Sequence, residues 1–297
     1  MIKCYTDIDK NLKQDICRQF KSGCDFDTII KMYPGVEYIT VYSILYNMCG
    51  FNEQDKLCQT SITGKKILIE SDTHVNSIYE NLSYIDKGID FAYVNGCKTF
   101  LHGGDFIEGN AKCKKELDLV KQANRFNEVY PVIDGVRTIG IYGNHDYGAI
   151  MNNPEVEFIL SSRKDIEILG YRKAFINWNG ITVSLTHEIK DYKIYLPSIS
   201  ETILLSFKGH SHIFGVTKVR RDDETIFIPA MCDDPVSKIG SSSTYNRKKK
   251  YDFYSTKPGF LIAEMFDDVV VITYYAFEYG SIVRQDEYVK TLKKTIY

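Results

Sequence analysis

Apolar side chains near the N-terminus recur at the spacing of amphipathic helices. Turn signals interrupt this spacing at Ser22-Gly23 and at Pro34-Gly35, and Asp25 or Asp27 is placed to cap the helix between them. Three short helices joined by tight turns are typical of a helix-turn-helix unit. A polar stretch over residues 52–63 follows, with the composition of a linker. The pattern predicts a small all-helical domain with its linker over residues 1–62.

From Lys65 onward, short apolar runs alternate with helical patterns. The expected order is strand, helix, strand, helix and strand, over residues 66–70, 78–95, 99–102, 112–130 and 138–142. Crossover connections of this kind imply parallel strands that are buried on both faces. In such sheets, ligands bind beyond the carboxyl ends of the strands.

The remainder of the chain is richer in strands than in helices. Strands are expected over residues 181–185, 202–207, 216–219, 225–228, 260–265 and 269–275. Residues 237–252 have the composition of an exposed loop and contain the basic run Arg247–Lys250. Together these patterns predict an α/β domain over residues 63–297.

Composition and charge narrow the class of protein. The 37 basic and 39 acidic side chains give a net charge of −2, which offers no whole-chain attraction to nucleic acid or to a membrane. No apolar run is long enough to span a membrane, and the first residues lack the apolar segment of a secretory signal. The eight cysteines form no Cys-x-x-Cys pair and are expected to be reduced thiols. We therefore expect a cytoplasmic protein.

Five of the six histidines come directly after predicted strands, together with acidic and amide side chains. The blocks are Ser71-Asp72-Thr73-His74, Gly104-Asp105, Gly143-Asn144-His145-Asp146, Thr186-His187 and Gly209-His210-Ser211-His212. Residues two apart in an extended segment point the same way, so Asp72 and His74 are expected to face one point. The same holds for His210 and His212. Carboxylate, imidazole and amide groups are the ligands that a pair of borderline divalent ions needs.

These five blocks, in this order, resemble the calcineurin-like metallophosphoesterases from Lys65 to about Asp233. The sequence is most similar to phage and prophage members that carry an N-terminal helix-turn-helix segment. The resemblance implies two mixed β-sheets packed as a sandwich and flanked by helices, an α/β fold of four layers. It also implies hydrolysis of phosphate esters by a hydroxide that bridges two metal ions.

The resemblance further implies a role for each matching residue. The ligands of one ion would be Asp72, His74, Asp105 and His212. The ligands of the second ion would be Asp105, Asn144, His187 and His210. Asp105 would bridge the two ions, His145 would protonate the leaving group, and Asp146 would orient the ring of His145. The expected cofactors are two divalent ions, Mn first, with Fe, Zn or Ni as alternatives.

His102 departs from this pattern because it lies inside a predicted strand, three residues before Asp105. We expect a hydrogen-bonded side chain in the core or behind the ligands rather than a ligand.

The residues beside the blocks bear on the substrate. Ser/Thr protein phosphatases of this family carry arginines next to the second and third blocks, where this chain has residues 106–109 and Tyr142. We therefore expect a phosphodiesterase that acts on nucleic acid, as a nuclease, or on nucleotides. The alternatives are a small-molecule phosphomonoesterase, a protein phosphatase, or a DNA-binding or adaptor protein whose phosphoesterase domain is idle.

The charge of the helical segment bears on its partner. Residues 1–62 hold seven basic and eight acidic side chains, and the expected recognition stretch over residues 36–47 has no Lys or Arg. Because contacts to phosphate need positive charge, DNA binding is one use among several. Packing on the enzyme, self-association and protein binding are the others. The run Arg247–Lys250 is either a solvated loop or a guide for a polyanion.

Overall fold

Two mixed β-sheets form the main body of the protein in the computed structural model, which describes residues 8–51, 53, 56–187, 203–220, 223–233 and 253–292. In spatial order, the first sheet comprises β14 (Ser281–Thr291), β13 (Val269–Glu278), β12 (Gly259–Met265), β2 (Lys66–Glu70), β3 (Thr99–His102), β4 (Arg137–Tyr142) and β5 (Ile166–Tyr171). The second comprises β1 (Thr60–Ile62), β6 (Lys173–Trp178), β7 (Ile181–Thr186), β8 (Ile203–Lys208), β10 (Asp223–Phe227), β9 (Phe214–Arg220) and β11 (Phe253–Ser255). The predicted loop over residues 237–252, with its basic run, lies outside the described residues.

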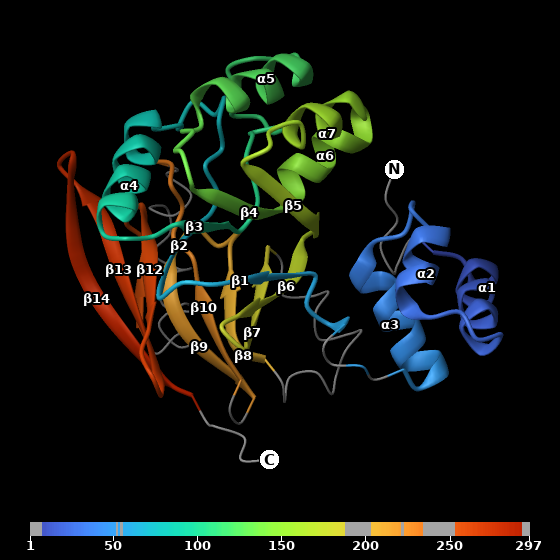
Figure 1. Ribbon diagram of the computed structural model, residues 1–297. Helices are drawn as coiled ribbons and strands as arrows, with labels where there is room; N and C mark the ends of the chain where they lie inside the picture. The colour runs from blue at the N-terminus through green and yellow to red at the C-terminus, as the bar shows by residue number, and fades with distance from the viewer. Residues whose placement is uncertain are drawn as a thin grey trace.

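The two sheets pack face to face, and helices cover the outer face of the first (Figure 1). The helices are α4 (Leu82–Val94), α5 (Leu119–Val129), α6 (Asn144–Asn152) and α7 (Glu155–Leu160). Strand β2 shows why both faces are buried: Ile67 and Ile69 enter the core between the sheets, and Leu68 enters the core beneath the helices. Alternate side chains of a strand point to opposite faces, so a central strand must be apolar throughout. The predicted sandwich flanked by helices is confirmed.

Parallel pairing brings the ends of several strands to one edge. Strands β2, β3, β4 and β5 are parallel neighbours, with Glu70 opposite His102 and His102 opposite Gly140. In the second sheet, β7 and β8 are also parallel. The segments that follow these strands therefore emerge together at the carboxyl edge of the sandwich.

The helices after β2 and β3 begin later than the sequence predicts. Helix α4 begins at Leu82 rather than Ile78, because Glu80 turns back and accepts a hydrogen bond from the backbone N–H of Asn76 at 2.6 Å. Helix α5 begins at Leu119 rather than Lys112, after Asp118 caps its first turn.

Several strands have no counterpart in the predicted set. Strand β1 lies within the predicted linker and pairs with β6, more than a hundred residues further along the chain. Strand β14 carries mostly exposed side chains, and β5 and β6 were not predicted either. Their pairing depends on distant partners, so local apolar pattern did not show them.

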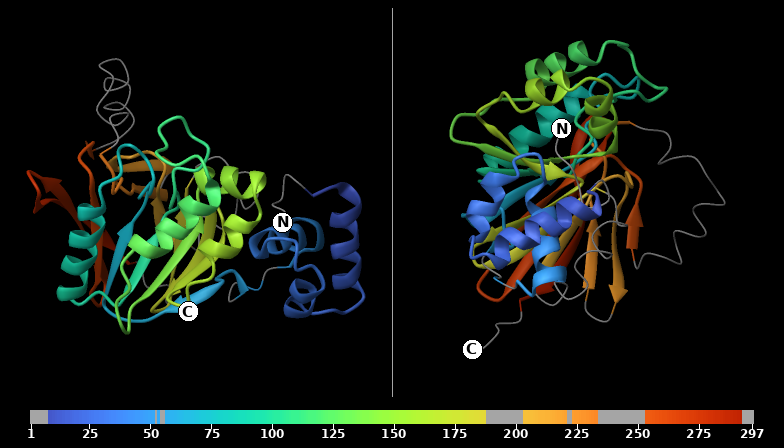
Figure 2. Two further views of the ribbon diagram at one scale, coloured as in Figure 1. Left: turned by 90° about the horizontal axis from the view of Figure 1, so that it is seen from above. Right: turned by 90° about the vertical axis from the view of Figure 1, so that its right-hand side faces the viewer.

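Three helices precede the sandwich, as predicted: α1 (Lys10–Lys21), α2 (Phe26–Met32) and α3 (Tyr38–Cys49). Asp9 caps α1, and Asp25 rather than Asp27 caps α2 by accepting from the N–H of Thr28 at 2.8 Å. Figure 2 shows this helical unit at the side of the sandwich where β6 lies.

Helix α3 is buried along most of its length, from Ile39 to Leu45. Just before it, Glu37 accepts a hydrogen bond from the N–H of Tyr171 at the end of β5, at 2.8 Å. Phe175 of β6 belongs to the core of the helical unit. Much of the expected recognition stretch therefore faces this protein's own core and sheet edge.

Candidate metal centre

The five polar blocks meet at the carboxyl edge of the sandwich. The segments after β2 and β3 are joined by hydrogen bonds from the N–H of Asp72 to the carbonyl of Gly104, at 2.9 Å, and from the N–H of His74 to the carbonyl of Asp105, at 3.1 Å. The third block opens α6 directly after β4. The remaining ligand candidates follow β7 and β8, which end at the same edge.

The backbone at this edge is left-handed at several of the predicted ligands. The φ angles are 55° at Asp72, 43° at His74, 58° at Asp105, 69° at His210 and 52° at His212. Residues other than Gly, Asn and Asp rarely adopt this backbone conformation, and such strain is concentrated at functional sites. The prediction that Asp72 and His74 converge because their segment is extended is therefore wrong: tight turns aim these side chains.

The first group of donors gathers around Asp72. Its Oδ1 lies 3.2 Å from Nε2 of His212 and 3.7 Å from Nε2 of His74. The two Nε2 atoms are themselves 3.2 Å apart. Ligands that are 2.0–2.2 Å from a common ion lie about 3 to 3.6 Å from each other. Asp72 Oδ1 is also a buried oxygen that accepts no hydrogen bond from the described residues, so this group fits a cation.

The second group gathers around His187. Its Nε2 lies 3.0 Å from Oδ2 of Asp105 and 3.0 Å from Oδ1 of Asn144. Its Nδ1 lies 2.7 Å from the carbonyl of Gly103, which holds the ring proton and turns the Nε2 lone pair toward the site. His210 offers a further ring nitrogen to the same cluster.

Asp105 lies between the two groups. Its Oδ2 is 3.0 Å from Nε2 of His187 and 3.6 Å from Nε2 of His74. All seven predicted ligands thus meet in one place, with Asp105 at the position that a bridging ligand requires. Their assignment as ligands stays a prediction.

Electrostatics tie the carboxylates to the rings. Burial opposes their charge, but the neighbouring histidines hold the pKa values of Asp72 and Asp105 below their usual range. Burial likewise opposes a charge on the rings, but nearby carboxylates raise the pKa of His74 well above its usual value and that of His187 to about 9. Protons on these rings therefore occupy the positions that a divalent ion would take.

His145 lies at the mouth of the site. Its side chain is 24% exposed, and its Nε2 lies 4.0 Å from Oδ2 of Asp105. Its Nδ1 lies 2.8 Å from the backbone carbonyl of Glu108, and its own N–H donates to Asp105 Oδ1 at 2.8 Å. The ring packs edge-on against that of His74.

Asp146 does not orient the ring of His145, so that prediction is wrong. Its buried carboxylate accepts hydrogen bonds from the N–H groups of Gly143, Phe106 and Ile107, at 2.9, 3.2 and 3.1 Å. Burial and the charge of Asp105 raise its pKa to about 6. Asp146 thus joins the loop after β3 to the start of α6, and the Glu108 carbonyl holds the ring.

Two further side chains complete the surroundings. Glu108 was not predicted as a site residue, and it places Oε2 3.0 Å from Nδ1 of His74. The signal in the sequence is an acidic residue three positions after Asp105, in an otherwise apolar run.

His102 is a hydrogen-bonded core residue, as expected. Its Nδ1 accepts from the N–H of Gly104 at 3.2 Å, its ring stacks on Phe106, and burial lowers its pKa to about 3.

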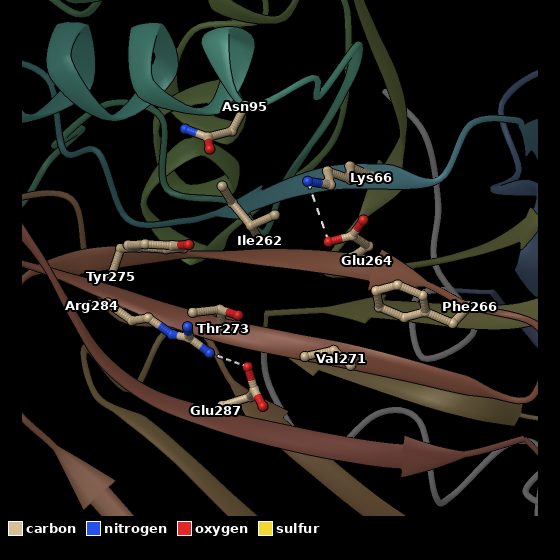
Figure 3. Close-up of a pocket in the computed structure, with 10 residues that line it drawn as sticks. All are labelled: Lys66, Asn95, Ile262, Glu264, Phe266, Val271, Thr273, Tyr275, Arg284 and Glu287. Atoms are coloured by element: carbon tan, nitrogen blue, oxygen red, sulfur yellow. Dashed lines mark hydrogen bonds and ion pairs between the residues drawn. The ribbon is translucent and has the colours of Figure 1, made fainter.

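A separate cavity of about 280 Å³ lies at the other end of the first sheet, beside the start of β2 (Figure 3). Its charged side chains are paired with one another, Lys66 with Glu264 at 3.3 Å and Arg284 with Glu287. No predicted site residue lines it.

Comparison with known proteins agrees with this geometry. The model of the calcineurin-like phosphoesterase family matches residues 65–290, which include all five blocks. The chain belongs to the calcineurin-like phosphoesterase family. Membership supports a phosphoester hydrolase that uses divalent metal ions and acts on a phosphate ester.

A search of curated proteins gave no match for this phosphoesterase. Among solved structures, GAP50, the anchor in the inner membrane complex of Plasmodium, is 12% identical, with 77% of this chain and 89% of that chain covered and a TM-score of 0.51. Zinc-bound Vps29 from Entamoeba histolytica is 13% identical over 75% of this chain and 98% of its own, with a TM-score of 0.42. An archaeal phosphodiesterase is 18% identical over 75% and 99%, with a TM-score of 0.40. The likeness to GAP50 supports the phosphoesterase fold alone.

Within the described residues of this phosphoesterase, no helix is long and apolar enough to cross a membrane.

Proposed function

We propose that this protein is a two-metal phosphodiesterase that hydrolyses nucleotides or nucleic acid. The observation that carries the proposal is the position of Asp105 between two groups of ring nitrogens, 3.0 Å from His187 and 3.6 Å from His74. Asp72, His74 and His212 would hold one ion with Asp105. Asn144, His187 and His210 would hold the other with Asp105.

The residues of the chain divide the remaining work. When bound, two divalent ions would polarise the phosphoryl group and activate water as the nucleophile, with Mn the first candidate for this mixed oxygen and nitrogen donor set. His145 holds one ring proton on Nδ1 against the Glu108 carbonyl, so in the doubly protonated ring Nε2 carries the second proton, which passes to the leaving oxygen and leaves a neutral ring. Asn144 contributes an oxygen without adding negative charge against the substrate.

The surroundings favour a diester over a monoester. A phosphomonoester presents up to two negative charges near neutral pH, and a diester presents one. The neighbours of the second and third blocks in sequence include no Lys or Arg for the extra charge, since Phe106, Ile107 and Tyr142 are buried apolar or aromatic side chains. We therefore assign the diester as the preferred substrate.

A paired substrate assay tests this proposal. The Mn²⁺-loaded full chain should hydrolyse bis-p-nitrophenyl phosphate with a higher kcat/KM than p-nitrophenyl phosphate. Cyclic nucleotides, single-stranded DNA, duplex DNA and RNA then identify the natural class. The His210→Ala variant serves as the control for contaminating activity. Faster hydrolysis of the monoester would contradict the diester assignment, and equal turnover by His210→Ala would contradict the metal assignment.

We also propose that the helical unit of residues 1–62 serves the enzyme as a cover for the edge of its sheets. Glu37 accepts from Tyr171 at the end of β5. Gln59 exchanges hydrogen bonds with the backbone of Phe175, at 2.9 and 3.2 Å. Exposed strand edges are templates for aggregation, and covering them is a known protection.

A further inference from the structure

Glu108 presents two oxygens to two histidine rings. It lies in the loop after β3 and is 5% exposed. Its carboxylate Oε2 is 3.0 Å from Nδ1 of His74, and its backbone carbonyl is 2.8 Å from Nδ1 of His145. One residue therefore contacts both a candidate ligand and the candidate proton donor.

We propose that Glu108 is a positioning residue that fixes His74 as a metal ligand through its carboxylate and His145 as a proton donor through its carbonyl. The inference rests on the proposed two-metal function and adds to it. It assigns two separable tasks to two parts of the same residue.

The physical basis is the choice of ring nitrogen that carries the proton. An acceptor beside Nδ1 keeps the proton there and leaves the Nε2 lone pair for a cation. In His74, Nε2 faces Nε2 of His212 at 3.2 Å and Oδ1 of Asp72 at 3.7 Å, inside the first donor group. A carboxylate behind a ligating histidine also makes the ring a better donor, and its loss costs about 10–100-fold in metal affinity.

The second task does not depend on the side chain. The carbonyl of Glu108 remains in any substitution, so the contact to His145 Nδ1 survives removal of the carboxylate. Variants at this position should therefore weaken metal binding and leave proton donation intact. A residue that only supported the fold would not separate these two effects.

A matched control lies in α5, against the same loop. Gln122 of α5 is fully buried, accepts from the N–H of Gly109 at 2.9 Å and donates to its carbonyl at 3.1 Å. Gln122→Ala loosens the loop beside Glu108, and none of the hydrogen bonds of Gln122 reaches a histidine. It therefore reports the effect of loop movement alone.

The test is calorimetric titration of metal-free full-length protein with Mn²⁺. Glu108→Ala should weaken binding by about 10–100-fold, Glu108→Gln by less because an amide oxygen would still lie beside Nδ1, and Gln122→Ala should bind close to wild type. At saturating Mn²⁺, the ratio of rates for p-nitrophenyl and alkyl leaving groups should stay at its wild-type value in Glu108→Ala.

Several outcomes would overturn the proposal. They are wild-type affinity in Glu108→Ala, equal weakening in Gln122→Ala, or loss of one whole ion with the other unchanged, which would make Glu108 a ligand. Where circular dichroism shows that Glu108→Ala fails to fold, Glu108→Gln decides, and wild-type affinity there counts against the proposal. A wild-type protein that binds no Mn²⁺ would instead refute the proposed function.

Discussion

The carboxyl edge of the sandwich and the N-terminal helical unit differ in backbone conformation and in how their polar groups are hydrogen-bonded. At the edge, five predicted ligands have left-handed backbone, and a buried oxygen of Asp72 accepts no hydrogen bond from the described residues. In the helical unit, Asp9 and Asp25 cap their helices, and Ile39 and Ile44 are fully buried in an apolar core. The first region is arranged for a ligand at some expense of stability, and the second is arranged for stability. We therefore expect substitutions in the two regions to separate activity from folding.

The largest effect is expected at the centre of the metal site. Asp105→Asn keeps the size of the side chain but removes the charge shared by both donor groups. Two ions contribute several kcal/mol to the transition state, and each 1.36 kcal/mol is tenfold in rate, so hydrolysis of bis-p-nitrophenyl phosphate should fall by about 10⁴-fold. In the metal-free state the variant also loses the attraction between the Asp105 charge and the histidine rings, so urea unfolding should show a loss of stability that is small compared with the loss of rate. Substantial remaining activity would show that the carboxyl edge is no more important for hydrolysis than the helical unit.

The next effect concerns proton donation. His145→Ala should slow hydrolysis of diesters with alkyl leaving groups by about 10²–10⁴-fold and affect p-nitrophenyl esters much less, since a good leaving group needs little protonation. Rates for a series of leaving groups check this. Equal losses across the series would remove His145 from the acid role.

In the helical unit, the effect should appear in stability alone. Ile39→Ala removes a fully buried side chain from α3 and should cost about 2–5 kcal/mol in the free energy of unfolding. The value of kcat/KM for the folded fraction should remain that of wild type. A loss of activity without a loss of stability would show that this unit takes part in catalysis.

The smallest effect is a pH dependence of metal binding. Carboxylates raise the pKa of His187 to about 9 against its burial, so at pH 7 the metal-free ring holds a proton that an ion must displace. Lowering the pH therefore weakens binding, by about tenfold per unit for each proton displaced. Titrations with Mn²⁺ at pH 7 and pH 8 measure the slope, and affinity that rises on acidification would contradict the account.

The sequence predicted the central strands well, for a physical reason. Strands β2 and β3 have the predicted bounds, because parallel strands buried on both faces are continuous apolar runs between turn residues. Strand β1 was predicted to be part of a linker. It pairs with β6 but buries only one side chain, Ile62, so it lacks the apolar run that marks a central strand. Local pattern shows burial, and it does not show which distant strand completes a sheet.

The candidate site was also predictable only in part. The ligand residues stood out as chemical types at strand ends, and the structure brings them together. The partners of His145 and Asp146 depended on how the loop after β3 folds back. Adjacency in sequence suggested that Asp146 holds the ring, whereas three backbone N–H groups occupy its carboxylate and the Glu108 carbonyl holds the ring. Hydrogen bonds to backbone carry no residue-type signal, so sequence alone could not identify them.

The most direct test of the account is a count of bound ions. Equilibrium dialysis against Mn²⁺ followed by metal analysis should give two ions per chain for the wild type. Asp105→Asn should hold fewer than one at the same free Mn²⁺ concentration. A wild-type protein without bound metal, or a variant that keeps both ions, would contradict the proposal that these seven side chains form a binuclear centre.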